Sequence, residues 1–466
     1  MYQRKIKLNI SVILNLMHKN AILFALFSRL GYNFLNEGKM RFSSMYDFFD
    51  IFEFVYLICL GVFFLFLLAG MIRYFIGIMK KTTITKTNIT TKFAIIIPAR
   101  DESKVIENNL KSIMQNNYPL DLFTIYLIVE SEDDPTVEIA KKYPNTKIFY
   151  RVNLNNVGKG YALDECIHYI YEFDDNYDAF LIIDADNLIS PNFLSRMNDA
   201  YNHGYDIACG KRENKDWNAS VVCGAAGLTF TIINSIQNKP KTNYGMKVTI
   251  TGTGYYLTSD VLREASGWPF HTLTEDYELT NYALVHDLKT AYIEDAIFYD
   301  EQPLKLRQSI VQRSRWIRGY FSVRKKYKKE KKKALKKNKN NLNFLYQFIG
   351  GIPMIAIALI TIAYLICCIV VMSYSYLVHD GYHMQYLIRV LCLLGAMYLA
   401  FILFTQYLFF IDRKYIKITP WNRFLVTLFH PVFMFTYINA AVRAPFVKNK
   451  WEKIEHSINV DAEDVK

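Results

Sequence analysis

The sequence predicts an α/β domain carried between membrane-spanning helices, and three observations predict it. Long apolar runs occur on both sides of a polar stretch at residues 90–325. Within that stretch, short runs rich in β-branched residues alternate with segments of helical spacing. Acidic residues follow several of the predicted strands. Strands that alternate with helices indicate a mainly parallel sheet covered by helices on both faces.

The predicted elements of this domain follow one another in chain order. The run KFAIIIPAR (92–100) predicts a buried strand, and residues 105–115 follow it with helical spacing. FTIYLIVE (123–130) predicts a second strand. In the helix after it, Asp134 is the expected cap and Pro135 occupies the first turn. The same alternation predicts a strand at 147–152, a helix at 160–173 and a buried strand at 179–186.

Four apolar runs are long enough to cross ~30 Å of hydrocarbon as helices. A buried core helix seldom stays apolar for so long. The first three runs are predicted membrane spans, at residues 54–79, 348–372 and 386–411. The fourth, at 424–442, contains His430 and Pro431, so it predicts either a span or a kinked segment at the membrane interface.

The basic residues indicate on which side of the membrane the polar domain lies. Lysines follow the first predicted span and precede the second, whereas the loop SYSYLVHDGYH after the second has no Lys or Arg. Because cytoplasmic loops carry the excess of Lys and Arg, the sequence predicts a multi-pass plasma-membrane protein with a cytoplasmic polar domain. A fourth run that spans fully would leave the basic C-terminus outside, and an interfacial segment would remove this conflict.

These observations divide the chain into six predicted parts. They are an N-terminal marginal span or interfacial helix (1–51), a transmembrane helix (52–80), the α/β domain (90–325), a basic juxtamembrane segment (326–343), a C-terminal transmembrane region of two to three helices (344–447), and a polar tail (448–466).

Two functional classes are disfavoured by charge and by the cysteines. The net charge is +12, but the lysine run KKYKKEKKKALKKNKN directly precedes a predicted span, which favours attraction to anionic lipid headgroups. No stacking platform or reading module accompanies it, so no nucleic-acid partner is predicted. The seven cysteines form neither a CxxC motif nor a Cys/His cluster, which argues against zinc and fits a reducing compartment.

Acidic residues lie where a parallel sheet binds its ligands, beyond the carboxyl ends of the strands. Asp184 and Asp186 follow the strand predicted at 179–186, and residues two apart on an extended chain point to the same side. Paired carboxylates suit Mg²⁺ or Mn²⁺, which can bridge a protein and a diphosphate. The alternative is a polar strand end with an Asp-Asn turn.

Two glycine-rich segments suggest close approach of a ligand. Lys159 lies between two glycines in NNVGKGYAL, which would let the backbone approach a phosphate while the lysine supplies charge. The alternative is an ordinary glycine turn, and the spacing is not that of a Walker loop. In TITGTGYYL, Gly252 and Gly254 interrupt a strand-like run, which predicts close approach of a ligand or a backbone, or alternatively a bulge.

Two further segments combine charge with possible chemistry. In HTLTEDYEL, Asp276 is a candidate general base beside Glu275, although Thr272 and Glu275 also have the spacing of a helix capping box. In QRSRW, the amide, guanidinium and indole of Gln312, Arg315 and Trp316 fall on one helix face. The alternative for this second segment is a packed surface with a cation over a ring.

The order of these motifs is more informative than any one of them. PARDE, an acid after the second strand, GKG, DAD, GTG, TED and QxxRW occur in turn and are followed by apolar helices. This order, over about residues 52–445, resembles the membrane-integrated family 2 glycosyltransferases, the group with the cellulose, hyaluronan and poly-N-acetylglucosamine synthases. The resemblance implies a GT-A fold, with a mainly parallel Rossmann-like sheet, in the cytoplasm. It also implies a nucleotide-sugar donor and a Mg²⁺ or Mn²⁺ cofactor.

The resemblance also implies roles for individual residues. Asp276, beside Glu275, would be catalytic and take the proton of the acceptor hydroxyl. Asp186 would hold the metal, together with Asp184. The nucleotide-sugar would contact Pro98, Ala99, Glu102, Glu130, Lys159 and Asp184. The departing diphosphate and the acceptor sugar would contact Gln312, Arg313, Arg315 and Trp316.

The resulting functional prediction is an inverting glycosyltransferase. It would move a sugar from UDP-GlcNAc or UDP-glucose to a growing polysaccharide at the cytoplasmic membrane face, with room for an accessory subunit or an oligomer. The alternatives are a single addition that makes a glycolipid, and a non-catalytic nucleotide sensor. Two segments depart from the pattern of the synthases: IVESEDDP lacks their paired aspartates directly after the strand, and GTGYY weakens the inference of processivity.

Overall fold

The computed structural model describes residues 45–79, 84–349, 352–379 and 381–447. The predictions for the segment before residue 45 and for the tail at 448–466 lie outside these ranges. The chain forms two compact units, which are described separately. Of the described residues, the smaller unit comprises 45–64, 354–379 and 381–393, and the larger comprises 65–79, 84–349, 352–353 and 394–447.

The larger unit is built on one eight-stranded mixed sheet with the strand order β3-β2-β1-β4-β7-β6-β8-β5. The half from β3 to β4 is parallel, β7 is antiparallel to both of its neighbours, and β6 is parallel to β8. The prediction of a mainly parallel sheet is therefore confirmed. The strands are β1 (Phe93–Pro98), β2 (Phe123–Val129), β3 (Thr146–Tyr150), β4 (Ala179–Ile182), β5 (Leu188–Ile189), β6 (Ile207–Asn214), β7 (Tyr255–Thr258) and β8 (Thr290–Asp300).

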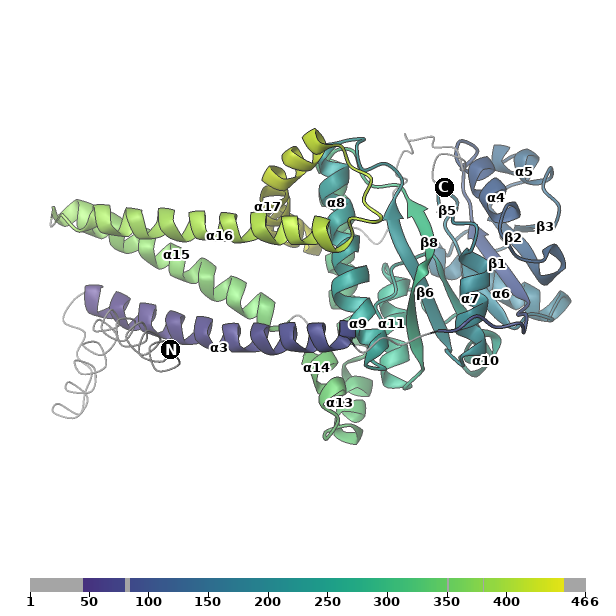
Figure 1. Cartoon of the computed structure of the whole chain (residues 1–466), viewed down its shortest axis with the longest axis horizontal. Helices are drawn as coiled ribbons and strands as arrows, with labels where there is room; N and C mark the ends of the chain where they lie inside the picture. Colours follow the sequence, from purple (N-terminus) through teal and green to yellow (C-terminus); the bar gives the residue numbers. More distant parts are fainter. Residues whose placement is uncertain (1–44, 80–83, 350–351, 380, 448–466) are drawn as a thin grey trace, which may run out of the picture. The chain divides into compact units, whose positions relative to one another are not determined.

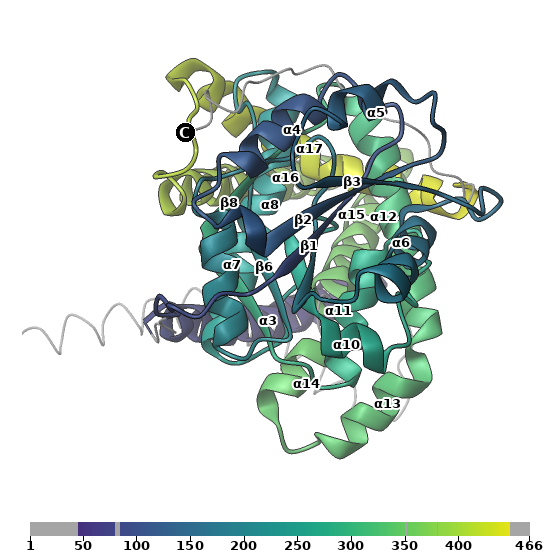
Figure 2. The same cartoon turned by 90° about the vertical axis from the view of Figure 1, so that its right-hand side faces the viewer.

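The period of two in β1 explains why helices cover both faces of the sheet. Ile95 and Ile97 point into one apolar core, whereas Ala94 and Ile96 point into the other. The first core also contains side chains of α4 (Ile106–Met114), α5 (Pro135–Ala140) and α7 (Phe193–Asn202). The second contains side chains of α6 (Lys159–Phe173), α10 (Ser259–Glu264) and α11 (Glu275–Val285), on the opposite side of the sheet in Figure 2.

The helix starts and strand ends can be compared with those predicted from the sequence, and two of them differ. The Asp134 carboxylate accepts a hydrogen bond from the Thr136 amide at 2.9 Å, so the predicted cap of α5 is confirmed. The strand predicted at 179–186 ends at Ile182, because Asp184 and Asn187 close a turn through a backbone hydrogen bond of 3.0 Å. The glycines of TITGTGYYL precede β7 rather than lying inside a strand.

The larger unit contains further helices outside the two cores of the sheet. α8 (Val221–Thr231) continues into the π-helix η2 (Ile232–Asn238), then α9 (Lys239–Asn243). α12 (Leu306–Lys326), α13 (Lys328–Lys337) and α14 (Leu342–Ile349) follow β8 in the chain, and the last two are labelled in Figure 1. Short 3₁₀ turns are η1 (Leu120–Leu122) and η3 (Ala444–Phe446).

Four helices in the described part of the chain are long and apolar enough to cross a membrane, judged by length and composition. They are α3 (Met45–Met79), α15 (Ile352–Val378), α16 (His383–Ile411) and α17 (Pro420–Arg443). α17 runs through Pro431 and buries one face, including Val426 and Phe433, against α8 and α12. Its opposite face, with Val432 and Phe435, is exposed apolar surface.

The smaller unit joins parts of α3, α15 and α16 through aromatic side chains. Tyr56 and Tyr364 stack with their ring centroids 4.2 Å apart. The Tyr364 hydroxyl donates to Glu53 at 2.8 Å, and Arg389 forms an ion pair with the same carboxylate at 3.0 Å. The Glu53 carboxylate is thus satisfied inside the unit by a hydroxyl and a cation.

Candidate active site

Lys159 connects the motifs that the sequence analysis singled out. It is the first residue of α6, and its ammonium bonds the Asp184 carboxylate after β4. It also donates to the Gly252 carbonyl at 2.6 Å and lies 4.0 Å from the Glu275 carboxylate. Three segments more than 20 residues apart in the chain therefore meet at one lysine.

The glycines on either side of Lys159 are required by the conformation and the packing of the backbone. Gly158 has φ +143°, which L side chains rarely adopt, and it ends the loop before α6. A Cβ on Gly160 would lie 2.1 Å from the Phe270 carbonyl oxygen, so no side chain fits there. Gly160 thus permits close approach of another backbone, while Lys159 between the two glycines reaches the site.

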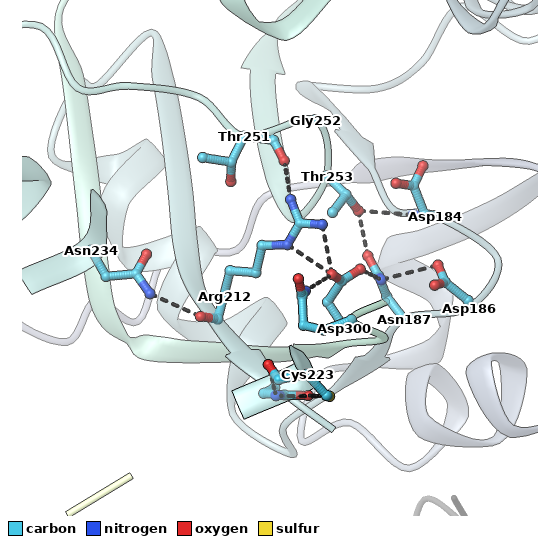
Figure 3. A network of polar contacts seen from close by, with 12 residues as sticks. Asp184, Asp186, Asn187, Arg212, Cys223, Asn234, Thr251, Gly252, Thr253 and Asp300 are labelled. Atoms are coloured by element: carbon cyan, nitrogen blue, oxygen red, sulfur yellow. Dashed lines mark hydrogen bonds and ion pairs between the residues drawn. The ribbon is translucent and has the colours of Figure 1, made fainter. Parts of the chain in front are cut away.

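The DAD segment forms a turn that side-chain amides hold in place (Figure 3). The Asp184 amide donates to the Thr253 hydroxyl at 2.8 Å, and that hydroxyl donates to the Asn187 side-chain oxygen at 2.5 Å. The Asn187 amide group donates to Asp186 at 3.2 Å and to Asp300 at 2.8 Å. The turn alternative is therefore correct in geometry, and it places both aspartates beside the start of β7.

Arg212 and Asp300 belong to the same network, although the sequence analysis did not assign them. Arg212 on β6 contacts the Asp300 carboxylate at 2.6 Å and donates to the Thr251 carbonyl at 2.7 Å (Figure 3). Its guanidinium lies over the Phe230 ring at 3.9 Å. Gln302 donates to Asp300 at 2.5 Å. The stretch YDEQP, which contains Asp300 and Gln302 and directly precedes the QRSRW helix, is the sequence signal that could have identified this part of the site.

Glu275 and Asp276 are the first two residues of α11. The capping box between Thr272 and Glu275 does not form, because the cap residue is Thr274 and the Thr272 amide donates to Glu278 at 3.1 Å. That alternative interpretation is wrong. Asp276 accepts from the Tyr277 amide at 2.7 Å. The pair thus lies in the first turn of a helix, where the helix dipole favours negative charge.

Burial opposes ionisation of this acidic pair. Withdrawal from water and the neighbouring Asp276 raise the pKa of Glu275 to about 7, although Lys159 acts in the opposite direction. Withdrawal from water also raises the pKa of Asp276, whereas Lys159 and Arg212 oppose that rise. The site therefore contains one carboxyl group, that of Glu275, that can exchange a proton near neutral pH.

The QRSRW segment is helical, as predicted, within α12. Trp316 meets Phe230 edge to face at 6.2 Å, and Phe230 is the ring under Arg212. The indole therefore lies one ring away from the Asp300 network. Gln312, Arg315 and Trp316 are all half-buried on this helix.

The Arg313 side chain points to α17, whereas the sequence predicted a contact with the diphosphate or the acceptor sugar. Its side chain is 1% exposed and its guanidinium donates to the Phe433 carbonyl at 3.3 Å and the Thr436 hydroxyl at 2.8 Å of α17. It also lies over the rings of Phe433 and Tyr437. This placement argues against the predicted contact of Arg313 with a diphosphate and indicates that it joins α12 to α17.

The predicted nucleotide residues lie at the carboxyl ends of β1 and β2. Pro98 is the last residue of β1, and the Ala99 amide donates to the Ile128 carbonyl at 2.9 Å. The Glu102 amide donates to the Thr136 hydroxyl at 3.0 Å.

Glu130 is paired with two arginines. It contacts Arg100 at 3.2 Å and Arg151 at 3.5 Å. Arg151 also donates to the carbonyls of Asn153 and Asn156 at 2.9 and 2.8 Å, so it orders the loop that leads to Lys159. Sequence reasoning missed Arg151, whose contacts depend on the pairing of β2 with β3.

The DAD turn offers two carboxylates, those of Asp184 and Asp186, to a hard divalent cation. No group of three or more His, Cys, Asp or Glu residues that could hold a metal occurs within residues 45–447 as described. Asp184 is bonded to Lys159, which leaves Asp186 as the main protein carboxylate for a metal. Mg²⁺ is commonly bound by one or two carboxylates together with substrate phosphates, and this donor set fits that mode.

The parallel half-sheet, its antiparallel extension and the acidic loops at one edge define a GT-A type domain. A solved mannosyltransferase of Pyrobaculum calidifontis has a similar fold. Its TM-score is 0.55 at 14% identity, over 85% of this chain and 99% of that one. The sequence profile described as "Glycosyltransferase like family 2" matches residues 91–319. These residues are therefore a glycosyltransferase family 2 domain.

Curated relatives resemble the chain over about half its length. The probable glycosyltransferase YdaM of Bacillus subtilis (strain 168) is 24% identical over 55% of this chain and 62% of its own. The hyaluronan synthase of Streptococcus pyogenes is 26% identical over 49% and 57%. Glucomannan 4-beta-mannosyltransferase 7 of Arabidopsis thaliana is 24% identical over 48% and 41%. The chain thus spans roughly half the length of these relatives.

Proposed function

We propose that this chain is a membrane-integrated, inverting glycosyltransferase that extends a polysaccharide at the cytoplasmic membrane face. UDP-GlcNAc and UDP-glucose are the proposed donors, with Mg²⁺ or Mn²⁺ as cofactor. The observation that carries the proposal is the convergence of Asp184, Gly252 and Glu275 on Lys159. This places a cation, a close backbone and an acidic pair around one point at the edge of the sheet.

The donor would bind across the carboxyl ends of the parallel strands. The nucleotide would lie against Pro98, Ala99, Glu102 and Glu130, and its diphosphate near Lys159. A bound divalent cation, held by Asp186 with a contribution from Asp184, would neutralise charge on the diphosphate. Arg315 and Gln312 would donate to the diphosphate as it leaves, since a guanidinium stabilises charge that grows in the transition state.

The acceptor would react by one in-line displacement. Asp276 takes the proton of the acceptor hydroxyl as its oxygen forms a bond to the anomeric carbon. The bond from that carbon to the diphosphate oxygen breaks, and its electron pair leaves with the nucleoside diphosphate. One displacement inverts the anomeric centre, so an α-linked donor yields a β-linked product. Trp316 offers an apolar ring to the acceptor sugar.

One observation favours a transferase over a nucleotide sensor. Another favours a polymer over a glycolipid as the product. A sensor has no use for the acidic pair in the first turn of α11, whose pKa values burial raises. The hyaluronan synthase and the glucomannan mannosyltransferase among the relatives make polysaccharide the first product to test.

The basic helix α13 is proposed to face anionic lipid headgroups. Ala334 is buried with Leu284 of α11 and Phe344 of α14, whereas the lysines on its other faces are exposed. The ring of Tyr346 on α14 stacks near Phe66 of the apolar helix α3 at 6.0 Å. α13 therefore directly precedes a segment that packs on a candidate membrane helix, and its charge suits an anionic surface.

The test measures release of nucleoside diphosphate by detergent-purified protein. UDP-GlcNAc, UDP-glucose and GDP-mannose are supplied with Mn²⁺ or Mg²⁺, with and without bacterial lipid extract. We expect turnover of a UDP-sugar, a high-mass product, and loss of activity with EDTA. A small organic-soluble product that requires lipid would favour the glycolipid alternative instead. No release from any donor under any condition would contradict the proposal.

Asp276→Asn provides the matched test of the base. This variant is expected to bind nucleoside diphosphate like the wild type but to lose at least ~100-fold in turnover. Asp260→Asn is the control, because Asp260 is an exposed acid in the first turn of the neighbouring helix α10. Full turnover in Asp276→Asn would exclude Asp276 as the base.

A further inference from the structure

A buried ionic cluster outside the candidate active site connects β6 to the end of α16. We call it the Lys211 cluster, and it consists of Lys211, Glu213, Ser235 and Asp412. The Lys211 ammonium lies 2.9 Å from the Asp412 carboxylate and 3.1 Å from Glu213. The three charged side chains are 0–3% exposed. Asp412 directly follows α16, in the part of the chain that belongs to the larger unit.

The π-helix η2 forms hydrogen bonds both to the Lys211 cluster and to β6, the strand that carries Arg212. The Ser235 hydroxyl donates to the Asp412 carboxylate at 2.8 Å. Its neighbour Asn234 donates to the Arg212 carbonyl at 2.8 Å (Figure 3). Two adjacent residues of η2 thus contact Asp412 and the backbone of Arg212, and π-helical turns of this kind occur frequently at functional sites.

The register of β6 changes at the same position. Gly210 pairs with Ile293 of β8, but Lys211 pairs with Ile297, so β8 carries three additional residues there. A Cβ on Gly210 would lie 2.4 Å from the Ala296 carbonyl oxygen, so only glycine fits. After this irregularity, successive side chains point to opposite faces. Lys211 therefore reaches Asp412, while Arg212 reaches Asp300 and Thr251.

Stability alone is a poor explanation for the Lys211 cluster. Removing charges from water costs several kcal/mol per ion, and well-packed apolar residues often replace a buried ion pair without loss of stability. Burial and the nearby Asp412 raise the pKa of Glu213, although Lys211 opposes them, which is the expected result of two acids sharing one cation. The charged side chains of the Lys211 cluster instead fix the position of β6 at the point where its register with β8 changes.

We propose that Asp412 and Lys211 are positioning residues for Arg212, so that the active-site geometry depends on the docked end of the apolar helix α16. The inference rests on the proposed function for its kinetic consequences. Arg212 contacts Asp300 and Thr251 only if β6 keeps its position after the irregularity at Lys211. Without the Asp412 carboxylate, Lys211 would keep only Glu213 as an acidic partner and would lose its link to the end of α16, and the neighbouring Arg212 would shift with the strand.

The kinetic test compares Asp412→Asn with Lys141→Met. Lys141 is the control because its ion pair with Glu138 at 2.6 Å is exposed and lies at the end of α5, which contacts β3, far from β6 in the strand order. We expect Asp412→Asn to lower kcat at least ten-fold with a smaller change in KM. The acidic limb of its pH profile should move to higher pH, because the Arg212 cation opposes the raised pKa of Asp276. A parallel fall of kcat and of folded fraction, with an unmoved pH profile, would overturn the inference.

Hydrogen exchange provides a readout that does not need activity. Asp412→Asn should raise exchange in peptides that cover residues 249–256, where Thr251 accepts from Arg212, and Lys141→Met should not. Equal exchange in both variants would overturn the inference. If the wild type turns over no donor, the proposed function fails, but this comparison still decides the positioning role.

A variant whose cluster carries no charge distinguishes an effect on the position of Arg212 from an effect on folding. In the triple variant Lys211→Met, Glu213→Gln, Asp412→Leu, we expect the unfolding temperature to return towards that of the wild type while kcat stays low. Combining Asp412→Asn with Arg212→Ala should lower kcat no further than Arg212→Ala alone. Wild-type kcat in the triple variant, or additive losses in the double variant, would show that the cluster does not act through Arg212.

Discussion

At the residue scale, the candidate site depends on how Lys159 is balanced by its neighbours. Burial opposes the charge of its ammonium, but Asp184, Glu275 and Asp276 outweigh that effect and raise its pKa. The lysine therefore stays charged, and it limits the rise in the pKa of both acids in α11. A cation shared by a strand end and a helix start holds acids together that would otherwise repel one another.

The raised pKa of Glu275 has a testable effect on stability. The unfolded chain releases this proton near pH 4.5, whereas the folded chain retains it up to about pH 7. The stability that Glu275 contributes relative to Glu275→Gln should therefore fall as pH rises through this window, by up to about 3 kcal/mol. Unfolding temperatures of both proteins between pH 4 and 8 measure the difference.

Glu138 is the control for this prediction, because its contribution to stability depends on pH in the opposite direction. Hydrogen bonding to Lys141 lowers the pKa of the exposed Glu138. Its contribution relative to Glu138→Gln should be constant above pH 4.5 and be lost only as pH falls below that value. A Glu275→Gln curve parallel to that of the wild type from pH 4 to 8 would refute the raised pKa.

At the element scale, the crossing of α11 and α12 sets the position of the acidic pair. A Cβ on Gly319 of α12 would lie 2.3 Å from the Thr274 hydroxyl, so the helices touch at the residue before Glu275. One turn away, the rings of Tyr277 and Tyr320 meet at 5.1 Å. The helix that carries the QRSRW segment thus packs directly against the start of the helix that carries the acids.

Gly319→Ala should therefore impair turnover. The added methyl group must push Thr274 away and with it the first turn of α11, so we expect kcat to fall at least ten-fold. Gly395→Ala is the matched control, since Gly395 is also helical and a Cβ there meets nothing within 4 Å. Nucleoside diphosphate release by the two variants measures the effect. Equal activity would mean that the crossing can relax without moving Asp276.

Among the predicted elements, those with strong local signals were correct. The strands at β1 and β2, the cap of α5 and the four apolar helices follow from periodicity, side-chain capping and length. The end of β4 was predicted four residues too late. The apolar run continues through Ile183, but the Asp184 amide donates to the Thr253 hydroxyl and the Asn187 amide donates to the Asp184 carbonyl, so the chain turns at Asp184. Thr253 becomes a neighbour only when β7 pairs with β4.

At the scale of the whole molecule, the distribution of charge matters more than its total. The exposed lysines of α13 are Lys328, Lys329, Lys332, Lys333, Lys336 and Lys337. Only one acid, Glu330, accompanies them on that helix. Their mutual repulsion is relieved by an anionic surface, and each lysine near such a surface contributes about 1 kcal/mol.

The lipid prediction can be checked in nanodiscs. Peptides that cover α13 should exchange hydrogen more slowly in phosphatidylglycerol than in phosphatidylcholine, and 0.5 M salt should remove the difference through screening. Reversing Lys329, Lys332 and Lys336 to Glu should abolish it. Reversing Lys104, Lys141 and Lys142, which changes the net charge equally, should not. Equal exchange in both lipids would contradict contact of α13 with anionic headgroups.

The sequence by itself determined the alternation of strands and helices, the apolar helices, the order of the motifs and the family that this order indicates. These features rest on neighbours within a few residues, where periodicity and capping act. Only the tertiary structure decided that Arg313 faces α17, that Arg212 pairs with Asp300, and that Lys211 meets Asp412 201 residues away. The direction of a charged side chain depends on which partner relieves its burial, and strand pairing and helix packing determine that partner.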